Sequence, residues 1–261
     1  MVASDFLVST QLQGFPWQTE GANQNVSILG TSGSGKSFTA KVMLLREFAR
    51  GARILALDPE REYCGLAKAA GGSVVDCGGG EGAPISPASD FTVFDIHALT
   101  EASDGVRRAQ YLNVLGYAWD LVREGQASGR PTLLVVDEAW LLADPQTPQA
   151  LGFLYRIAKR IRKYGGSLVV ITQNVVVDFL APELARFGQP VIDSASTKIL
   201  MRQEAKDLEA LRDLLRLTEA ECDLLSGAKR GEGLLLAGNQ RVRLQVRASA
   251  REAEIIAGAT L

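Results

Sequence analysis

Short apolar runs alternate along the chain with longer stretches in which apolar residues recur at helical spacing. The apolar runs predict strands at residues 26–29, 53–57, 73–76, 91–96, 131–138, 167–173 and 197–202. The helical spacing predicts helices at residues 37–49, 63–70, 103–123, 146–163 and 203–216. The run at 131–138 is continuously apolar until it ends in two acids, which is typical of a strand with helices over both faces. The alternation therefore predicts an α/β fold with a mostly parallel central sheet and helices on both faces.

The two ends of the chain and one internal segment have a different pattern. Residues 1–25 are expected to form an edge strand or a lead-in loop, and residues 78–90 are rich in Gly, Pro and Ser, which predicts a loop. The tail predicts a small β-hairpin and a closing helix, at 233–237, at 241–246 and from Ser249. A length of 261 residues suits one large α/β domain, so we expect residues 1–261 to form a single domain.

Composition narrows the class of protein. Apolar residues make up 46% of the chain and charged residues 22%, which indicates a folded protein rather than a disordered one. The 28 basic and 30 acidic residues give a net charge of −2, so no overall positive field favours nucleic acid or an acidic membrane. The three cysteines form no CxxC pair, which argues against a disulfide framework or a zinc site and favours a reducing cytoplasm.

The sequence offers no membrane anchor of its own. No apolar run approaches the roughly 18 residues that a membrane-spanning helix needs. The first residues also lack the basic start and apolar core of a signal peptide. We therefore expect a cytoplasmic protein that reaches a membrane only through partners.

A glycine-rich segment follows the first predicted strand and precedes the first predicted helix. It fits GxxxxGK[ST] at Gly30, Gly35, Lys36 and Ser37. Backbone N–H groups in such a loop, with a helix N-terminus behind them, bind the phosphates of a nucleotide such as ATP. Lys36 is expected to reach the terminal phosphates and the Ser37 hydroxyl to ligate Mg²⁺. A Gly/Ser-rich loop that matches by accident is the alternative, and the flanking strand and helix argue against it. The candidate nucleotide-binding residues are Gly30, Thr31, Ser32, Gly33, Ser34, Gly35, Lys36, Ser37 and Phe38.

Two acids, Asp137 and Glu138, and one glutamine, Gln173, lie at the ends of later predicted core strands. Asp137 is expected to hold Mg²⁺ through water together with Ser37, and Glu138 to polarise the water that attacks the γ-phosphate. The alternative is a pair of surface acids that cap the following helix. Gln173, at the end of the next core strand, is a candidate sensor of the γ-phosphate or the water, although a glutamine ends such strands often by chance. Because the carboxyl ends of parallel strands meet at one edge of the sheet, we expect these side chains to lie near the phosphate loop.

The cation that would complete such a site has several candidates. A cluster precedes the Gly165-Gly166 break and consists of Lys159, Arg160, Arg162 and Lys163. Its simple interpretation is a solvated helix end whose charges suit the helix dipole. Its functional interpretation is an arginine finger supplied to a neighbouring subunit in a ring. Arg230 is a second candidate.

Other conspicuous residues have structural interpretations. His97, the single histidine, makes no metal cluster by itself and is expected to be an ordinary core or surface histidine. We expect the three tryptophans, Trp17, Trp119 and Trp140, to belong to the core rather than to a cofactor site. The charged helix at 203–216 is expected to be a solvated face, with subunit contact as the alternative. The positions of the 103–123 helix predicted to face the core are Val106, Leu112, Leu115, Trp119 and Val122.

A series of motifs, in this order, resembles that of one family. The motifs are GTSGSGKSF at 30–38, DPEREY at 58–63, VVDEAW at 135–140, RKYGG at 162–166, ITQ at 171–173 with Asp178-Phe179, and RGEGLL at 230–235. The family is the fourth VirB protein, the traffic ATPase of bacterial type IV secretion and conjugation, within the HerA/FtsK superfamily. The resemblance covers about residues 20 to 256.

The resemblance implies a RecA-like P-loop ATPase core that uses ATP and Mg²⁺. It also implies a hexameric ring at the cytoplasmic face of the inner membrane, in contact with other secretion components. Carried over by residue, Lys36 and Ser37 would bind nucleotide and Mg²⁺, and Asp137 and Glu138 would be the Walker B pair. Gln173 would be the sensor. Arg162 would be the finger, because in related motors that arginine lies 11 positions before the sensor glutamine.

The chain departs from the family pattern in two places. Family members carry a large N-terminal domain that this sequence does not contain, and usually a helical subdomain inserted after the third core strand. Here only the loop segment 78–90 stands at the insertion point. The departures affect partner binding and regulation, whereas the nucleotide motifs are intact.

Three functions are compatible with these motifs. The leading one is an ATP-hydrolysing motor that energises assembly and substrate transfer by a type IV secretion or conjugation system. The alternative is a DNA-translocating pump or coupling protein of the same superfamily, which the balanced charge disfavours because a DNA channel needs basic residues. The third is a nucleotide-binding regulatory or scaffold module that hydrolyses little ATP in isolation.

Overall fold

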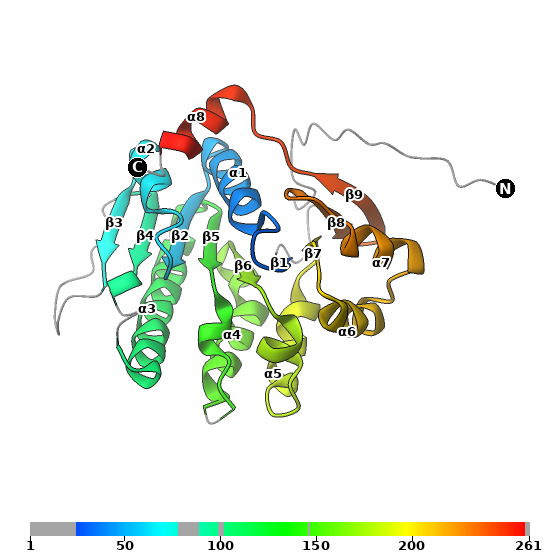
Figure 1. Cartoon of the computed structure of the whole chain (residues 1–261). Helices are drawn as coiled ribbons and strands as arrows, with labels where there is room; N and C mark the ends of the chain where they lie inside the picture. Colours follow the sequence, from blue (N-terminus) through cyan, green and yellow to red (C-terminus); the bar gives the residue numbers. More distant parts are fainter. Residues whose placement is uncertain (1–24, 78–88, 99–101, 146, 259–261) are drawn as a thin grey trace.

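The centre of the molecule is a twisted β-sheet, in a computed structural model that describes residues 25–77, 89–98, 102–145 and 147–258 (Figure 1). Within that part the sheet has nine strands in the order β3-β4-β2-β5-β6-β1-β7-β8-β9. The strands are β1 (Val26–Leu29), β2 (Arg53–Asp58), β3 (Ser73–Asp76), β4 (Phe91–Asp95), β5 (Thr132–Val136), β6 (Gly166–Thr172), β7 (Thr197–Met201), β8 (Glu232–Ala237) and β9 (Gln240–Gln245). The predicted strands are confirmed, each within about two residues of its expected bounds.

The strands from β1 to β7 run parallel, so their carboxyl ends share one edge of the sheet. β8 is antiparallel to β7, and β9 is antiparallel to β8, so the tail forms the expected hairpin at the end of the sheet. β1 lies between β6 and β7, and β5 lies between β2 and β6. This order places the segments that follow β1, β2, β5 and β6 near one another.

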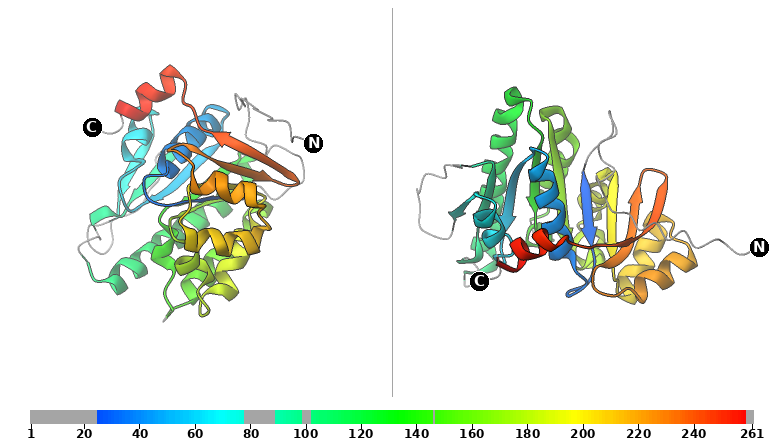
Figure 2. Two further views of the ribbon diagram at one scale, coloured as in Figure 1. Left: turned by 45° about the vertical axis from the view of Figure 1, so that its right-hand side comes forward. Right: turned by 90° about the horizontal axis from the view of Figure 1, so that it is seen from above.

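Helices cover both faces of the sheet, as predicted. They are α1 (Lys36–Ala49), α2 (Cys64–Ala69), α3 (Asp104–Glu124), α4 (Gln149–Arg160), α5 (Ala185–Ser194), α6 (Ala205–Leu215), α7 (Glu219–Ser226) and α8 (Ala250–Gly258). Figures 1 and 2 show α1 and α8 on one face and α3 and α4 on the other. None of the described helices is long and apolar enough to cross a membrane.

Two hydrophobic clusters lie on opposite faces, because alternate residues of a strand point to opposite sides. In β2, Leu55 and Leu57 belong to the cluster under α3 and α4, whereas Ile54 and Ala56 belong to the cluster under α1 and α2. All four are fully buried. The continuous apolar character of the core strands thus follows from their being covered twice.

Several local predictions need correction. The helix expected at 146–163 is α4 followed by a short 3-10 turn, η5 (Ile161–Tyr164). Val106, assigned to the inner face of α3, is 55% exposed; that face starts instead with the fully buried Tyr111. The helix expected as a solvated face is α6, whose Lys206, Glu209, Arg212 and Asp213 are exposed as predicted, whereas Asp207 and Leu211 are buried. The Asp207 carboxylate accepts a hydrogen bond from the backbone N–H of Val176.

Besides short 3-10 turns, three further elements were not predicted. α5 contains Pro190 within its span and Gly188 at a close approach, where an added Cβ would lie 2.2 Å from the carbonyl oxygen of Phe179. Both residues disfavour a helix in a sequence-based assignment. α7 is short and begins with a capping box formed by Thr218 and Glu221. The third element is a π-helical turn, η6 (Val176–Leu180). The expected lead-in segment, up to residue 24, and the predicted loop from residue 78 to 88 lie outside the described residues.

Candidate nucleotide-binding site

The glycine-rich loop joins the carboxyl end of β1 to the amino end of α1. Gly33 and Gly35 have φ angles of 70° and 104°, in the left-handed region that other residues rarely adopt. An added Cβ on Gly35 would lie 2.8 Å from the backbone nitrogen of Gly231. That N–H donates a hydrogen bond of 2.9 Å to the carbonyl oxygen of Ser34. The turn before β8 therefore supports the loop from a part of the chain far away in sequence.

The polar side chains of the loop are placed for phosphate. Lys36 is 7% exposed, and its Nζ donates to the carbonyl oxygen of Thr31 at 3.0 Å. Burial lowers the pKa of Lys36, and the nearby carboxylates of Glu138 and Asp137 act in the opposite direction. The Ser34 hydroxyl is buried and has no hydrogen-bond partner among the described residues. The negative charge of a phosphate bound in the loop would pair with Lys36, so the loop fits a polyphosphate.

Asp137 follows β5 and is 4% exposed. Its Oδ2 accepts a hydrogen bond of 2.9 Å from the hydroxyl of Tyr63, and its backbone oxygen accepts one from the hydroxyl of Tyr111. Burial, followed by the negative charge of Glu138, raises the pKa of Asp137 to about 7. A cation next to Asp137 would favour its charged form, and a carboxylate with the Ser37 hydroxyl is the oxygen donor set that Mg²⁺ prefers.

Glu138 lies at the mouth of the site with both carboxylate oxygens occupied. Oε1 accepts from Nε2 of Gln173 at 2.6 Å, and Oε2 accepts from Nε1 of Trp140 at 2.6 Å. The backbone of Glu138 has φ 47°, in the left-handed region, and it begins the short 3-10 turn η4 (Ala139–Leu142). This conformation turns the chain away from the strand direction and brings Trp140 out beside Glu138. The prediction that Trp140 belongs to the core is wrong, because its side chain is 40% exposed, whereas Trp119 is 9% exposed and belongs to the core as predicted.

A turn after β2 supports Asp137 from the neighbouring strand. Asp58 is fully buried, and its carboxylate accepts hydrogen bonds of 2.8 Å from the backbone N–H groups of Glu62 and Tyr63. Burial raises the pKa of Asp58, and these two hydrogen bonds oppose that shift. The turn delivers Tyr63 to Asp137 and brings Glu62 to Lys41 of α1, with which it forms an ion pair of 2.5 Å. The motif at 58–63 was recognised in the sequence, but this role was not.

One cavity of about 680 Å³ joins these groups, a volume within the range of small-molecule sites. Most of the predicted site residues line it: Ser32, Gly33, Gly35, Lys36, Ser37, Phe38, Glu138 and Gln173. Its other lining residues, which the sequence did not assign to ligand contact, are Lys41, Glu60, Glu62, Trp140 and Ile256, together with the candidate Arg230. Gly30, Thr31, Ser34 and Asp137 lie behind this lining, and all four are buried.

The two candidate arginines lie in different places. Arg230 is exposed and lines the cavity of its own chain, next to the phosphate loop. Arg162 is exposed in η5, just before the amino end of β6, whereas Gln173 follows the carboxyl end of the same strand. The seven residues of β6 separate them by roughly 23 Å at about 3.3 Å per residue. Arg162 therefore cannot reach the cavity of its own chain.

Other predicted features have simple outcomes. Nδ1 of His97 lies 3.0 Å from the carbonyl oxygen of Pro59, so this histidine has an ordinary structural contact. No cluster of three or more His, Cys, Asp or Glu side chains suited to a metal ion occurs in the described ranges. A single carboxylate with a hydroxyl does not form such a cluster, and Mg²⁺ carried by a nucleotide does not need one, because it keeps phosphate and water ligands.

Comparison with known proteins identifies relatives of this fold. Residues 20–229 match the family described as "Helicase HerA, central domain". The structure of VirB4 of Thermoanaerobacter pseudethanolicus is 36% identical in sequence, with a TM-score of 0.85, over 91% of this chain and 93% of that one. No curated protein matches the sequence.

More distant structures share only the fold. The genome packaging NTPase B204 from Sulfolobus turreted icosahedral virus 2, in complex with AMP, is 16% identical over 87% of this chain and 98% of its own, with a TM-score of 0.55. EssC (ATPases 2 and 3) from Geobacillus thermodenitrificans is 13% identical over 91% of this chain and 43% of its own, also with a TM-score of 0.55. These two matches show that distantly related proteins share the fold of this chain. The family match and the similarity to VirB4 show that this chain belongs to the HerA central-domain family and, within it, to the VirB4 proteins.

Proposed function

We propose that this chain is a Mg²⁺-dependent ATP-hydrolysing motor that energises assembly and substrate transfer by a type IV secretion or conjugation system. The observation that carries the proposal is that Lys36, Glu138 and Gln173 line one cavity with the phosphate loop. Binding groups for a triphosphate and a carboxylate able to polarise water are thereby within reach of the same ligand. The similarity to VirB4 supports the choice of system.

Each residue of the site has a separate role in ATP hydrolysis. The loop N–H groups and Lys36 bind and orient the phosphates, and Glu138 accepts a proton from the attacking water. Gln173, whose amide contacts Glu138 at 2.6 Å, orients that carboxylate and the water. Mg²⁺, held by Ser37 and through water by Asp137, would neutralise the charge of the phosphates. We also propose that several copies, expected to be six, form a ring at the cytoplasmic face of the inner membrane, in contact with other secretion components.

A DNA-translocating motor is the second candidate, and one surface favours it. α4 and η5 carry five exposed cations and no acidic residue within their spans: Arg156, Lys159, Arg160, Arg162 and Lys163. Such a surface suits the phosphate backbone of DNA. The family match to the central domain of the helicase HerA points the same way.

One set of measurements tests the site and separates the candidates. We expect Mg²⁺-dependent ATP turnover by the wild-type chain, and at least a hundredfold loss in Glu138→Gln with ATP binding retained, because a positioned base contributes about 10²–10⁴ in rate. Unchanged turnover in Glu138→Gln would contradict the catalytic assignment. Stimulation by DNA that falls steeply with salt would favour the DNA motor over the secretion motor. Tight ATP binding without turnover, in an assembled ring, would instead indicate a regulatory module.

A further inference from the structure

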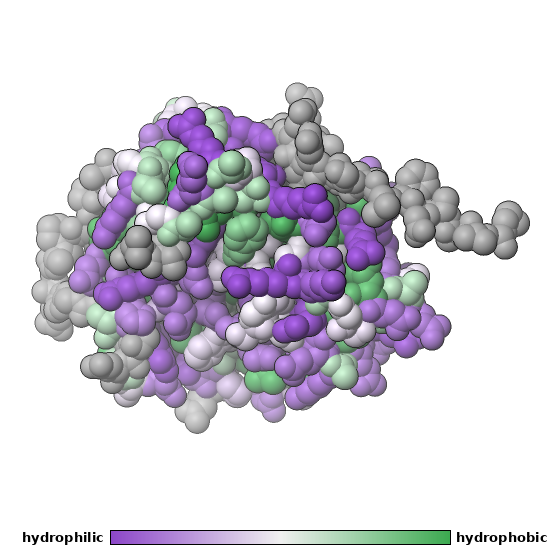
Figure 3. All heavy atoms as spheres, turned by 45° about the horizontal axis from the view of Figure 1, so that its top comes forward, coloured by the Kyte–Doolittle hydropathy of each residue, from purple (hydrophilic) through white to green (hydrophobic). Residues whose placement is uncertain are grey.

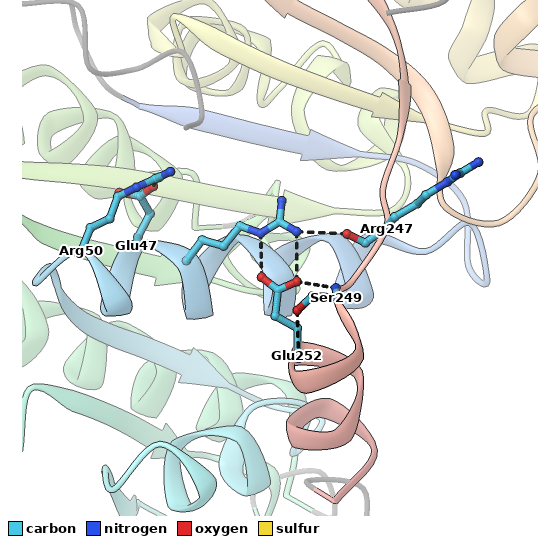
Figure 4. Close-up of polar contacts among 6 residues, drawn as sticks. Glu47, Arg50, Arg247, Ser249 and Glu252 are labelled. Atoms are coloured by element: carbon cyan, nitrogen blue, oxygen red, sulfur yellow. Dashed lines mark hydrogen bonds and ion pairs between the residues drawn. The ribbon is translucent and has the colours of Figure 1, made fainter. Parts of the chain in front are cut away.

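The last described helix, α8, packs on α1 and α2 and is tied to α1 by an ionic clamp between Arg46, in the last turn of α1, and Glu252. Nε and Nη2 of Arg46 on α1 donate to Oε1 and Oε2 of Glu252 on α8, at 2.7 and 3.0 Å. Nη2 also donates to the carbonyl oxygen of Arg247, just before the helix, at 3.0 Å. Figure 4 shows Glu252 beside Ser249 at the start of α8, where the helix crosses α1. A two-point contact of this kind fixes orientation as well as distance.

The same carboxylate also caps its own helix. The backbone N–H of Ser249 donates to Oε2 of Glu252 at 2.7 Å, and the backbone N–H of Glu252 donates to Oγ of Ser249 at 3.2 Å. This reciprocal arrangement is a capping box, which fixes the first turn of a helix. Glu252 therefore sets both where α8 begins and how it lies on α1.

One turn after Glu252, Ile256 lines the same cavity as the phosphate loop. It is 9% exposed, and it packs in the hydrophobic cluster that also includes Phe38 from the first turn of α1. Figure 3 shows apolar and hydrophilic side chains reaching the surface together on the side of the molecule where α8 lies. The cavity therefore has an apolar part, built by Phe38 and Ile256, besides its polar parts.

The phosphate groups of a bound nucleotide account for only one part of this cavity. Lys36, Glu138 and Gln173 are suited to the terminal phosphate and its attacking water. A nucleotide also carries a flat, weakly polar base, which binds best against apolar side chains. Phe38 follows Ser37 in the first turn of α1, and both residues line the cavity. Among the described residues, Ile256 is the other apolar residue besides Phe38 and Trp140 that lines the cavity with a large side chain.

We propose that α8 forms part of the nucleoside-binding site, with Ile256 and Phe38 contacting the base of a nucleoside triphosphate and the Arg46–Glu252 clamp fixing Ile256 in place. This inference rests on the proposed function, since it takes the phosphates to bind at the glycine-rich loop. It assigns the C-terminal helix a role in affinity for the nucleoside. Turnover at saturation depends on other residues.

The test compares ATP with inorganic tripolyphosphate, which has the phosphates but no nucleoside. Calorimetric titration with Mg²⁺ should show that Ile256→Ala and Glu252→Gln weaken ATP binding by about five- to tenfold, whereas tripolyphosphate binding changes less than twofold. Ile256→Leu, which keeps the apolar volume, should bind ATP like the wild type. Glu254→Gln is the matched control, because Glu254 is an exposed acid on the same helix.

Other results would contradict either this inference or the proposed function. Equal weakening of ATP and tripolyphosphate would show that α8 acts on the phosphate loop and would overturn the proposal. Tighter ATP binding or faster turnover in Glu252→Gln would also overturn it, because α8 would then obstruct the site. If the wild type bound neither ligand, the proposed ATPase function itself would fail. Melting temperatures of all variants identify any loss of binding that comes from unfolding.

Discussion

Trp140 shows how one residue in the cavity acts through another. Its indole N–H contacts Oε2 of Glu138, while Gln173 contacts the other oxygen. A carboxylate held by two donors keeps one rotamer, which matters for a group that must face a water molecule. Within the described residues, the Trp140 side chain hydrogen-bonds to Glu138 and makes no hydrogen bond to the phosphate loop, so we regard it as a positioning residue.

Replacing Trp140 tests this role. Trp140→Phe removes the N–H and keeps an aromatic ring, so we expect the maximal turnover of ATP to fall about tenfold while KM changes little, because a hydrogen bond to a charged group contributes about 1.5–3 kcal/mol. Steady-state ATPase kinetics measure both quantities. Trp140→His restores a ring N–H and should recover part of the rate. If turnover in Trp140→Phe equals that of the wild type, Trp140 does not position Glu138.

Among the elements, the attachment of α8 to α1 depends on the negative charge of Glu252, which protonation at low pH removes. The hydrogen bonds from Arg46 hold the pKa of Glu252 at about 2, below its ordinary value of 4.5. Because the folded pKa is depressed, the stabilisation is complete above about pH 4.5 and is lost as the pH falls from there toward 2.

Hydrogen exchange of α8 amides should show this dependence. At neutral pH we expect Glu252→Gln to lose protection in α8 relative to the wild type, and we expect this difference to shrink as the pH falls below about 4.5. Protection in β5, at the centre of the sheet, serves as the control for global unfolding. A difference between the two proteins that stays constant down to pH 2 would contradict the assigned ion pair.

The elements also show which features could be predicted from the sequence and which could not. Apolar runs predicted the core strands because burial on both faces leaves a continuous signal, and the phosphate loop was recognisable because its glycines, lysine and serine are adjacent in sequence. Trp140 was misassigned because its exposure depends on the left-handed backbone of Glu138, which a hydrophobic pattern does not encode. Tyr63 and Asp137 are 74 positions apart and meet only because β2 is next to β5. Ile256 reaches the cavity only through the packing of α8 on α1 and α2.

At the scale of the whole molecule, Arg162 and the cavity occupy opposite ends of β6. A subunit cannot bring its own Arg162 to its own nucleotide, so any role of this residue in hydrolysis requires a neighbour. A head-to-tail interface that closes into a ring provides that neighbour. The trans-acting finger, like the extent of a single domain over residues 1–261, stays a prediction.

Mixed rings test the finger directly. We expect Arg162→Ala and Lys36→Ala subunits each to be inactive alone, and a mixture of the two to recover ATPase activity, because some interfaces then combine an intact loop with an intact finger. Subunit exchange is verified by mass spectrometry. No recovery in rings shown to be mixed would exclude Arg162 as the finger, and Arg230, which lines the cavity of its own chain, would be the next residue to replace.

The hydrogen bond from Gly231 to Ser34 also sets an order of events during synthesis. The phosphate loop is translated well before the turn at Gly231 that supports it and before α8, which packs on α1. At about 5–20 residues per second, the loop waits roughly 10–40 s for these partners. A nascent chain therefore carries the phosphate-loop motif long before it carries the complete site, so we expect ATP to stabilise the finished subunit rather than early folding intermediates.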